Sequence, residues 1–196
     1  YGIKDVQEMN RFFAYIAYNT GKEFSLERIS QESGIEKNTI KKYIEYLEAA
    51  FLIKVIHKVD EKSARFKRIT FFKIYLTNTS IRSALFSPID FTDEEMGLMV
   101  ETAIFAQWMH ESTQDLRYAR WKISTVEGEV DMVHVDALRQ KALSCLEIKW
   151  SNRFTSRPGE LKSLFYFCDI NKIPNATVTT IDQKTSLDYN NLQLDF

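Results

Sequence analysis

The feature that most constrains the fold is a change of hydrophobic pattern near Pro88. Before it, segments with helical periodicity lead into two strand-like runs, whereas beyond it one helical segment leads into several short runs of β-branched and aromatic residues. A chain of 196 residues has room for two small domains. We therefore expect an α/β (α+β) chain with one domain at residues 1–87 and a second at residues 88–196.

The net charge of the chain also changes sign between residues 1–87 and residues 88–196. Residues 1–87 contain 15 Lys and Arg against 10 Asp and Glu, a net charge of +5. Residues 88–196 contain 11 against 17, a net charge of -6, so the overall value of -1 conceals two halves of opposite sign. A basic half suggests a nucleic-acid partner and an acidic half suggests a bound cation, with chance as the alternative explanation.

The first half opens with three expected helices. Residues 3–18 repeat apolar side chains at spacings of three and four. Ser25 is the expected N-cap of a short helix that ends at Gly34, and a further helix is expected from Lys37 to Ala50. Two helices around a glycine-containing turn predict a helix-turn-helix. The expected buried stripe of the second helix of this pair comprises Ile40, Ile44, Leu47 and Phe51.

Two strand-like runs, Leu52–Val59 and Arg68–Leu76, follow and flank a basic tip at residues 60–67. They predict a β-hairpin wing and therefore a winged helix. The expected contacts with DNA phosphates are Lys37, Lys41, Lys42, Lys62, Arg65, Lys67 and Arg68. One alternative is a solvated charged face, because Glu36, Glu45 and Glu48 lie on the same helix as three of these lysines. The other is a winged helix that docks a protein.

The second half is expected to run helix, three strands, helix, strand. Thr92 is the expected N-cap of a helix that continues to Glu111, because Glu95 follows it by three residues as in a capping box. The remaining elements are expected at residues 116–124, 129–135 and 142–150 for the strands, 160–168 for the helix and 176–181 for the last strand.

Candidate catalytic residues lie on two of these strands. Asp131 falls in GEVDMVHV, and Glu147 and Lys149 fall in ALSCLEIKW. Because alternate residues of a strand share a face, Glu147 and Lys149 should emerge together. Carboxylates and water suit Mg²⁺ or Mn²⁺, which lowers the pKa of an attacking water and neutralises a phosphate. Glu101, in an apolar helical segment, is a further candidate because a buried carboxylate needs a partner.

Glu101, Asp131 and the Glu147-Ile148-Lys149 triplet, in this order of expected elements, resemble the PD-(D/E)XK nuclease superfamily. The resemblance implies a mixed sheet flanked by helices and a metal-dependent endonuclease that hydrolyses phosphodiesters with Mg²⁺. It assigns metal binding to Glu101, Asp131 and Glu147, and it assigns catalysis to Asp131, Glu147 and Lys149. The alternative is a degenerate domain in which the amine of Lys149 fills the gap between the carboxylates.

A narrower resemblance covers nearly the whole chain. SLERISQESGIEKNTIKKYIEYLEAAFLI, FFKIYLTNTSI, GLMVETAIFAQW, GEVDMV and LEIKWS are similar to the C-terminal region of a family of prokaryotic AAA-type ATP-binding proteins. That resemblance implies a winged helix, a PD-(D/E)XK-like domain and an N-terminal ATPase domain that would bind ATP. No P-loop occurs here and the chain starts at Tyr1, so we expect a piece of a longer protein. The chain departs from the family pattern at Glu36 and Asn78.

The rival function is a non-catalytic interaction module that couples this ATPase to a protein or DNA partner. No apolar run approaches the roughly 20 residues of a membrane span, so no membrane partner is expected. Two cysteines, Cys145 and Cys168, are too few for a disulfide framework and fit a cytoplasmic location. Cys145 is expected to be a packing residue. The sequence leaves oligomer formation open.

Overall fold

The computed structural model describes residues 5–63, 70–93, 95–111, 115–136, 138–139 and 141–196. Within them the chain forms two compact units, one of residues 5–56 and 70–110, the other of residues 57–63 and 111–196. The mixed α/β class is confirmed. The units differ from a division after residue 87, because residues 88–110 belong to the first unit and residues 57–63 to the second. The domain boundary after residue 87 stays a prediction.

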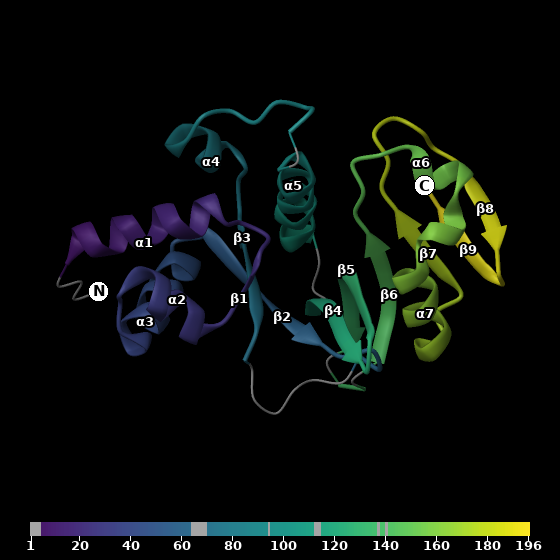
Figure 1. Cartoon of the computed structure of the whole chain (residues 1–196), viewed down its shortest axis with the longest axis horizontal. Coiled ribbons are helices and arrows are strands. Elements are labelled where there is room, and N and C mark those ends of the chain that lie inside the picture. Colours follow the sequence, from purple (N-terminus) through teal and green to yellow (C-terminus); the bar gives the residue numbers. More distant parts are fainter. Residues whose placement is uncertain (1–4, 64–69, 94, 112–114, 137, 140) are drawn as a thin grey trace. The chain divides into compact units, whose positions relative to one another are not determined.

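The first unit combines helices with a short sheet (Figure 1). Its elements are α1 (Val6–Tyr18), β1 (Glu23–Phe24), α2 (Leu26–Ser33), α3 (Lys37–Ala49), β2 (Ile53–Val59), β3 (Phe72–Leu76), α4 (Ser80–Leu85) and α5 (Met96–Glu111). The strand order is β1-β3-β2, with β1 antiparallel to β3, and β2 continues into the second unit. Helices α1 to α3 and these strands share one apolar core.

Local signals set the helix ends around the turn between α2 and α3. The Ser25 hydroxyl accepts a hydrogen bond from the backbone N–H of Arg28 at 3.1 Å, and Gly34 takes the left-handed conformation with φ of 73°. Both expectations are therefore confirmed. Helix α3 buries Ile40, Ile44 and Leu47 as expected.

Two expectations about helix ends are wrong. Phe51 is 77% exposed with φ of 56°, because α3 ends at Ala49 and the chain has turned away from the core before Phe51. Thr92 is not the N-cap of α5, which begins only at Met96. A turn precedes it, in which the Asp90 N–H donates to Asp93 Oδ2 at 2.8 Å.

The second unit is a mixed sheet with a helix packed on it (Figure 1). Its elements after β2 are β4 (Asp115–Ile123), β5 (Val126–Asp136), β6 (Lys141–Glu147), α6 (Arg153–Ser156), the 3₁₀ helix η1 (Pro158–Glu160), α7 (Lys162–Asn171), β7 (Asn175–Val178), β8 (Ser186–Tyr189) and β9 (Leu192–Asp195). The strand order is β2-β4-β5-β6-β7-β9-β8. The β4, β5 and β6 strands are antiparallel neighbours, and β7 runs parallel to β6. The expected order of three strands, a helix and a strand is confirmed.

The core of this unit lies between α7 and the sheet. Leu164 and Phe167 of α7 pack in one cluster with strand residues such as Val133 and Val178. On the sheet, Trp121 of β4 pairs with Gly128 of β5, where a Cβ atom would lie 2.2 Å from the Trp121 ring. Gly128 thus makes room for the indole. Among the described residues, no helix has both the length and the apolar character needed to cross a membrane.

Candidate functional site

Asp131, Glu147 and Lys149 meet in the second unit. Met132 pairs with Leu146 across the antiparallel strands β5 and β6, and Asp131 and Glu147 are the residues next to this pair on the two strands. The ammonium nitrogen of Lys149 lies 2.7 Å from Glu147 Oε1 and 3.6 Å from Asp131 Oδ2. The expectation that alternation would bring Glu147 and Lys149 together is confirmed, although β6 itself ends at Glu147.

The backbone that carries these side chains is fixed from both sides. On one side, Asp131 Oδ2 accepts a hydrogen bond from the Ile148 N–H at 2.8 Å. On the other, Thr179 Oγ1 accepts from the Lys149 N–H at 2.7 Å and donates to the Lys149 carbonyl at 3.0 Å, while the Thr179 N–H donates to the Glu147 carbonyl at 3.0 Å. Sequence reasoning missed Thr179. The sequence feature that could have indicated Thr179 is its position directly after a strand, next to other threonines.

The surroundings of Glu147 destabilise the ionised form of its carboxyl group. The residue is only 7% exposed, and within the described part of the chain its Oε2 atom has no hydrogen-bond partner. The pKa of Glu147 is raised to about 8, because burial and the charges of Asp131 and Glu129 raise it more than Lys149 lowers it. Lys149 alone therefore does not offset the cost of burying an ionised Glu147 beside Asp131.

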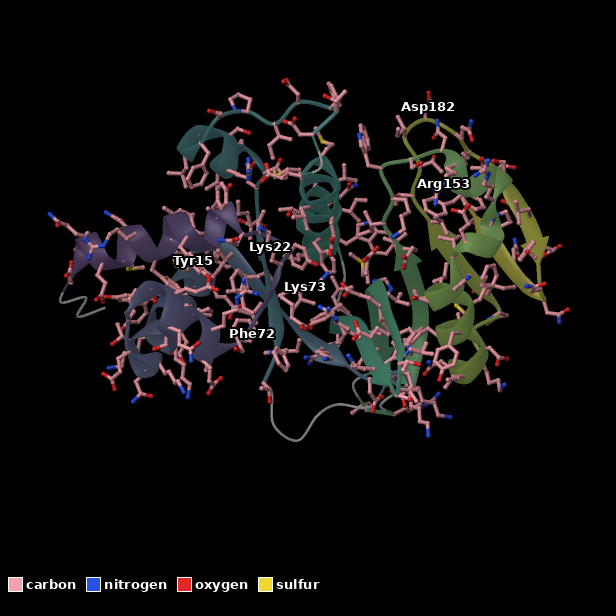
Figure 2. All side chains as sticks on the ribbon, viewed as in Figure 1. Tyr15, Lys22, Phe72, Lys73, Arg153 and Asp182 are labelled. Atoms are coloured by element: carbon pink, nitrogen blue, oxygen red, sulfur yellow. The ribbon has the colours of Figure 1, made fainter. Side chains whose placement is uncertain are left out.

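The segments that lead away from the site are tied to each other. Asn152 follows Lys149 closely, and its Nδ2 donates to Asp182 Oδ1 at 2.6 Å, while the Ile181 N–H donates to Asn152 Oδ1 at 3.0 Å. Arg153 of α6 forms an ion pair with Glu160. Figure 2 shows Arg153 and Asp182 at the same end of this unit. These bonds tie the chain that follows Lys149 to the chain that follows Thr179.

Glu101 lies on α5 in the first unit, where it has a different set of partners. Its Oε1 accepts from Lys73 Nζ at 2.8 Å and from the Tyr75 hydroxyl in a short hydrogen bond. Lys73 and Tyr75 are two residues apart on β3 and therefore share a face of the strand. Lys73, Tyr75 and Glu101 are all buried (Figure 2 labels Lys73). The expected partner of this buried carboxylate is therefore Lys73, which sequence reasoning missed although a lysine within an apolar strand signalled it.

The set of metal ligands expected from sequence is incomplete. In the described ranges, no group of three or more His, Cys, Asp or Glu side chains is placed to hold a metal ion. Asp131 and Glu147 are together, and Glu101 is engaged by Lys73 and Tyr75. The metal-ligand assignment of Glu101 stays a prediction that this geometry does not favour.

The expected DNA contacts are only partly described. Lys41 and Lys42 are exposed on α3, and Lys62 is exposed beyond β2. Lys37 forms an ion pair with Glu27 at 3.0 Å. Arg65, Lys67 and Arg68 lie outside the described residues.

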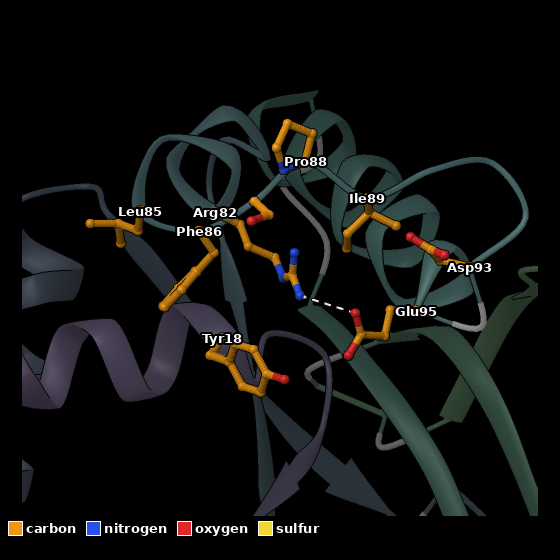
Figure 3. A pocket seen from close by; sticks show the side chains of 9 residues that line it. Tyr18, Arg82, Leu85, Phe86, Pro88, Ile89, Asp93 and Glu95 are labelled. Carbon is orange, nitrogen blue, oxygen red and sulfur yellow. Dashed lines mark hydrogen bonds and ion pairs between the residues drawn. The ribbon is translucent and has the colours of Figure 1, made fainter.

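The first unit also contains a hollow of about 570 Å³ that sequence reasoning missed (Figure 3). Arg82 of α4 lines it and is 5% exposed, with its guanidinium over the Tyr18 ring and 3.3 Å from Glu95 Oε2. Asp93 also lines the hollow, where its Oδ2 accepts the hydrogen bond from the Asp90 N–H. The ion pair joins α4 to the turn before α5.

Comparison with known families gives one match. A family model described as a domain of unknown function (DUF8612) matches residues 1–94, a little under half of the chain. The match includes α1 to α4 and stops before α5, Asp131 and Glu147. No curated protein and no solved structure matches the chain.

Proposed function

We propose that the second unit hydrolyses phosphodiester bonds of DNA with the help of Mg²⁺ or Mn²⁺. The observation that carries the proposal is that Asp131 and Glu147 both contact Lys149 Nζ, while Glu147 Oε2 is buried without a hydrogen-bond partner in the described part of the chain. Glu147 is buried and Asp131 is partly buried beside it, so their charges repel each other, and a divalent cation offsets this repulsion. A purely structural ion pair has no need of the second carboxylate.

The residues present fit a divalent cation through carboxylate oxygens. Asp131 and Glu147 would hold it, and when bound it lowers the pKa of an attacking water and neutralises a phosphate. Lys149 Nζ would hold the water in position for attack, and Thr179 fixes the Lys149 backbone that sets where this amine points. We leave Glu101 out of the site because Lys73 and Tyr75 already bond its carboxylate.

The order of elements supports the fold part of the proposal. The succession β4, β5, β6, α7, β7 agrees with the strand and helix order implied by the PD-(D/E)XK resemblance, with Asp131 on β5 and Glu147 on β6. In the first unit, the succession α1, β1, α2, α3, β2, β3 with strand order β1-β3-β2 is the order of a winged helix. We therefore propose a winged helix for the first unit and a PD-(D/E)XK-like fold for the second.

Cleavage of linear and branched DNA in Mg²⁺ or Mn²⁺ tests the proposal. We expect cleavage by the wild type and its loss in Asp131→Asn and Glu147→Gln. Glu127→Gln is the matched control, because Glu127 lies on the same strand as Asp131, is exposed and pairs with Lys122. Equal cleavage by wild type and Asp131→Asn, purified in parallel, would contradict the assignment.

For the first unit we propose DNA binding through α3. Lys41 and Lys42 are exposed on this helix and can contact phosphates. The double change to Glu should weaken DNA binding and flatten its salt dependence, whereas Lys162→Glu on α7 should leave both unchanged. An unchanged affinity and salt slope in the Lys41/Lys42 variant would contradict DNA binding by this helix.

A second candidate function has its own supporting observation. Lys149 Nζ contacts both Glu147 and Asp131, which is the contact expected of an inactive ion-pair cluster. In that case the chain would be a cytoplasmic interaction module that couples an ATPase of the prokaryotic AAA type to a protein or DNA partner. The cleavage experiment separates the two, because an inactive cluster gives no metal-dependent cleavage with any substrate.

A further inference from the structure

The two cysteines of the chain lie side by side in the core of the second unit. Cys145 is on β6 and Cys168 is on α7, and their sulfur atoms are 3.3 Å apart. Both residues are buried, with exposed fractions of 5% and 2%. A disulfide bond is about 2.05 Å long, so a shift of roughly 1 Å between the sulfurs would allow a covalent bond. Because the chain has two cysteines in 196 residues, a disulfide bond within it can form only between Cys145 and Cys168.

Cys168 has a route to solvent that burial alone does not reveal. It lines a hollow of about 500 Å³ at the C-terminal end of α7, together with Phe165, Ile173, Asn191 and Leu192. A molecule the size of hydrogen peroxide fits this space easily. Cys145 does not line the hollow. An oxidant that enters the hollow therefore reaches Cys168 before Cys145, whose sulfur lies 3.3 Å from that of Cys168.

We propose that Cys145 and Cys168 are a peroxide-oxidisable pair that forms an intramolecular disulfide. In the first step, the Cys168 sulfur attacks one oxygen of hydrogen peroxide. An S–O bond forms, the O–O bond breaks, and the departing hydroxide takes the thiol proton and leaves as water.

In the second step, the Cys145 sulfur attacks the sulfur of the Cys168 sulfenic acid. An S–S bond forms, the S–O bond breaks, and the hydroxyl leaves as water with the Cys145 proton. The two thiols lose two electrons, and one peroxide is reduced to two waters. The modification is independent of the proposed function.

The crosslink joins elements that are otherwise held by packing. It ties α7 to β6 at a position two residues before Glu147. Closing the loop between β6 and α7 restricts the unfolded chain, so the oxidised protein should unfold at a higher temperature than the reduced protein. Reduction by a dithiol should reverse the change.

Intact-mass spectrometry of the native full chain tests the proposal. The protein is treated with equimolar hydrogen peroxide, unfolded and alkylated with iodoacetamide. We expect loss of two hydrogens, no alkyl group, and a peptide pair joined through Cys145 and Cys168, whereas untreated protein takes two alkyl groups. Two alkyl groups after peroxide, oxygen adducts without a crosslink, or disulfide-linked dimers would each overturn the proposal.

Single variants test the order of attack. In Cys145→Ser, peroxide and dimedone together should label Cys168, because its sulfenic acid has no neighbouring thiol. In Cys168→Ser, Cys145 should stay unlabelled in the folded protein, with folding checked by far-UV circular dichroism. Labelling of Cys145 alone would overturn the assignment of Cys168 as the first sulfur attacked. The wild-type mass measurement needs neither variant.

Discussion

Each unit contains a buried glutamate with a lysine partner, and the two glutamates differ in what else surrounds them. Glu101 in the first unit accepts from Lys73 at 2.8 Å and from the Tyr75 hydroxyl. Glu147 in the second unit faces Lys149 at 2.7 Å, but it also faces Asp131. Its second oxygen has no hydrogen-bond partner among the residues that the structure describes. Donors surround the first carboxylate, whereas the second has a like charge beside it.

The difference separates a structural ion pair from a candidate binding site. A buried carboxylate with a lysine and a tyrosine hydroxyl as donors stabilises its surroundings as it stands. A buried carboxylate beside another one costs free energy, which the single charge of Lys149 offsets only in part. Such costs concentrate at functional sites, so the comparison favours Glu147 over Glu101 as the residue with a chemical function.

The largest expected effect comes from breaking the pair in the first unit. Lys73→Met leaves Glu101 buried without its cation, which should lower the free energy of unfolding by about 3 kcal/mol. Urea denaturation followed by fluorescence measures the change.

The double variant Lys73→Met/Glu101→Leu supplies the control, because it removes both charges. It should recover much of the lost stability. If Lys73→Met alone costs less than about 0.5 kcal/mol, the pair behaves like a solvated surface ion pair and the contrast with Glu147 disappears.

An uncharged packing defect in the second unit should have the next largest effect. Gly128→Ala places a Cβ atom 2.2 Å from the Trp121 ring and should cost about 2 kcal/mol. Gly97→Ala on α5 is the matched control, since its Cβ would meet no atom within 4 Å apart from its chain neighbours and its own helix backbone, and it should be neutral or slightly stabilising. Because Gly128→Ala alters no charge, its cost should be the same at pH 5 and pH 9. A cost that changes between these pH values would contradict this account of Gly128.

The stability of the second unit should also depend on pH through Glu147. The pKa of Glu147 is raised to about 8 in the folded chain, while the unfolded carboxyl has its ordinary value of 4.5. Between these values the unfolded state binds fewer protons, so the stability of the wild type falls as pH rises from about 4.5 to 8. Glu147→Gln removes the titrating carboxyl, so this fall should be largely absent in the variant.

Urea denaturation of wild type and Glu147→Gln at pH 5 and pH 9 provides the measurement. The free energy of unfolding of Glu147→Gln, relative to that of the wild type, should be higher at pH 9 than at pH 5. A difference of the opposite sign would show that Glu147 is ionised and stabilised by Lys149 alone, as in an ordinary ion pair.

Sequence reasoning succeeded where the signal is local. Ser25 and Gly34 mark the ends of α2 through their own side-chain and backbone chemistry, and strand alternation placed Glu147 beside Lys149. It failed at Phe51, because helical periodicity does not show where the chain turns away from the core. The short, polar strands β8 and β9 were missed because they lack runs of β-branched residues.

The partners of the candidate residues were harder to predict than the residues themselves. Glu101 was recognised as a buried acid in need of a partner, but Lys73 is 28 residues away and only the folded chain brings them together. Thr179 reaches Lys149 across 30 residues through the parallel pairing of β6 and β7. Such contacts depend on strand order, which a pattern of residues along one chain does not determine.

Calorimetric titration with Mn²⁺ at pH 8.5 tests the central claim most directly, because Glu147 is then largely ionised. The measurement compares the wild type with Glu147→Gln and Glu101→Gln, each checked for folding. We expect saturable binding by the wild type, retained binding by Glu101→Gln and loss of binding in Glu147→Gln. Binding that survives in Glu147→Gln, or no binding by the wild type, would contradict the claim that the Asp131–Glu147 pair is a cation site.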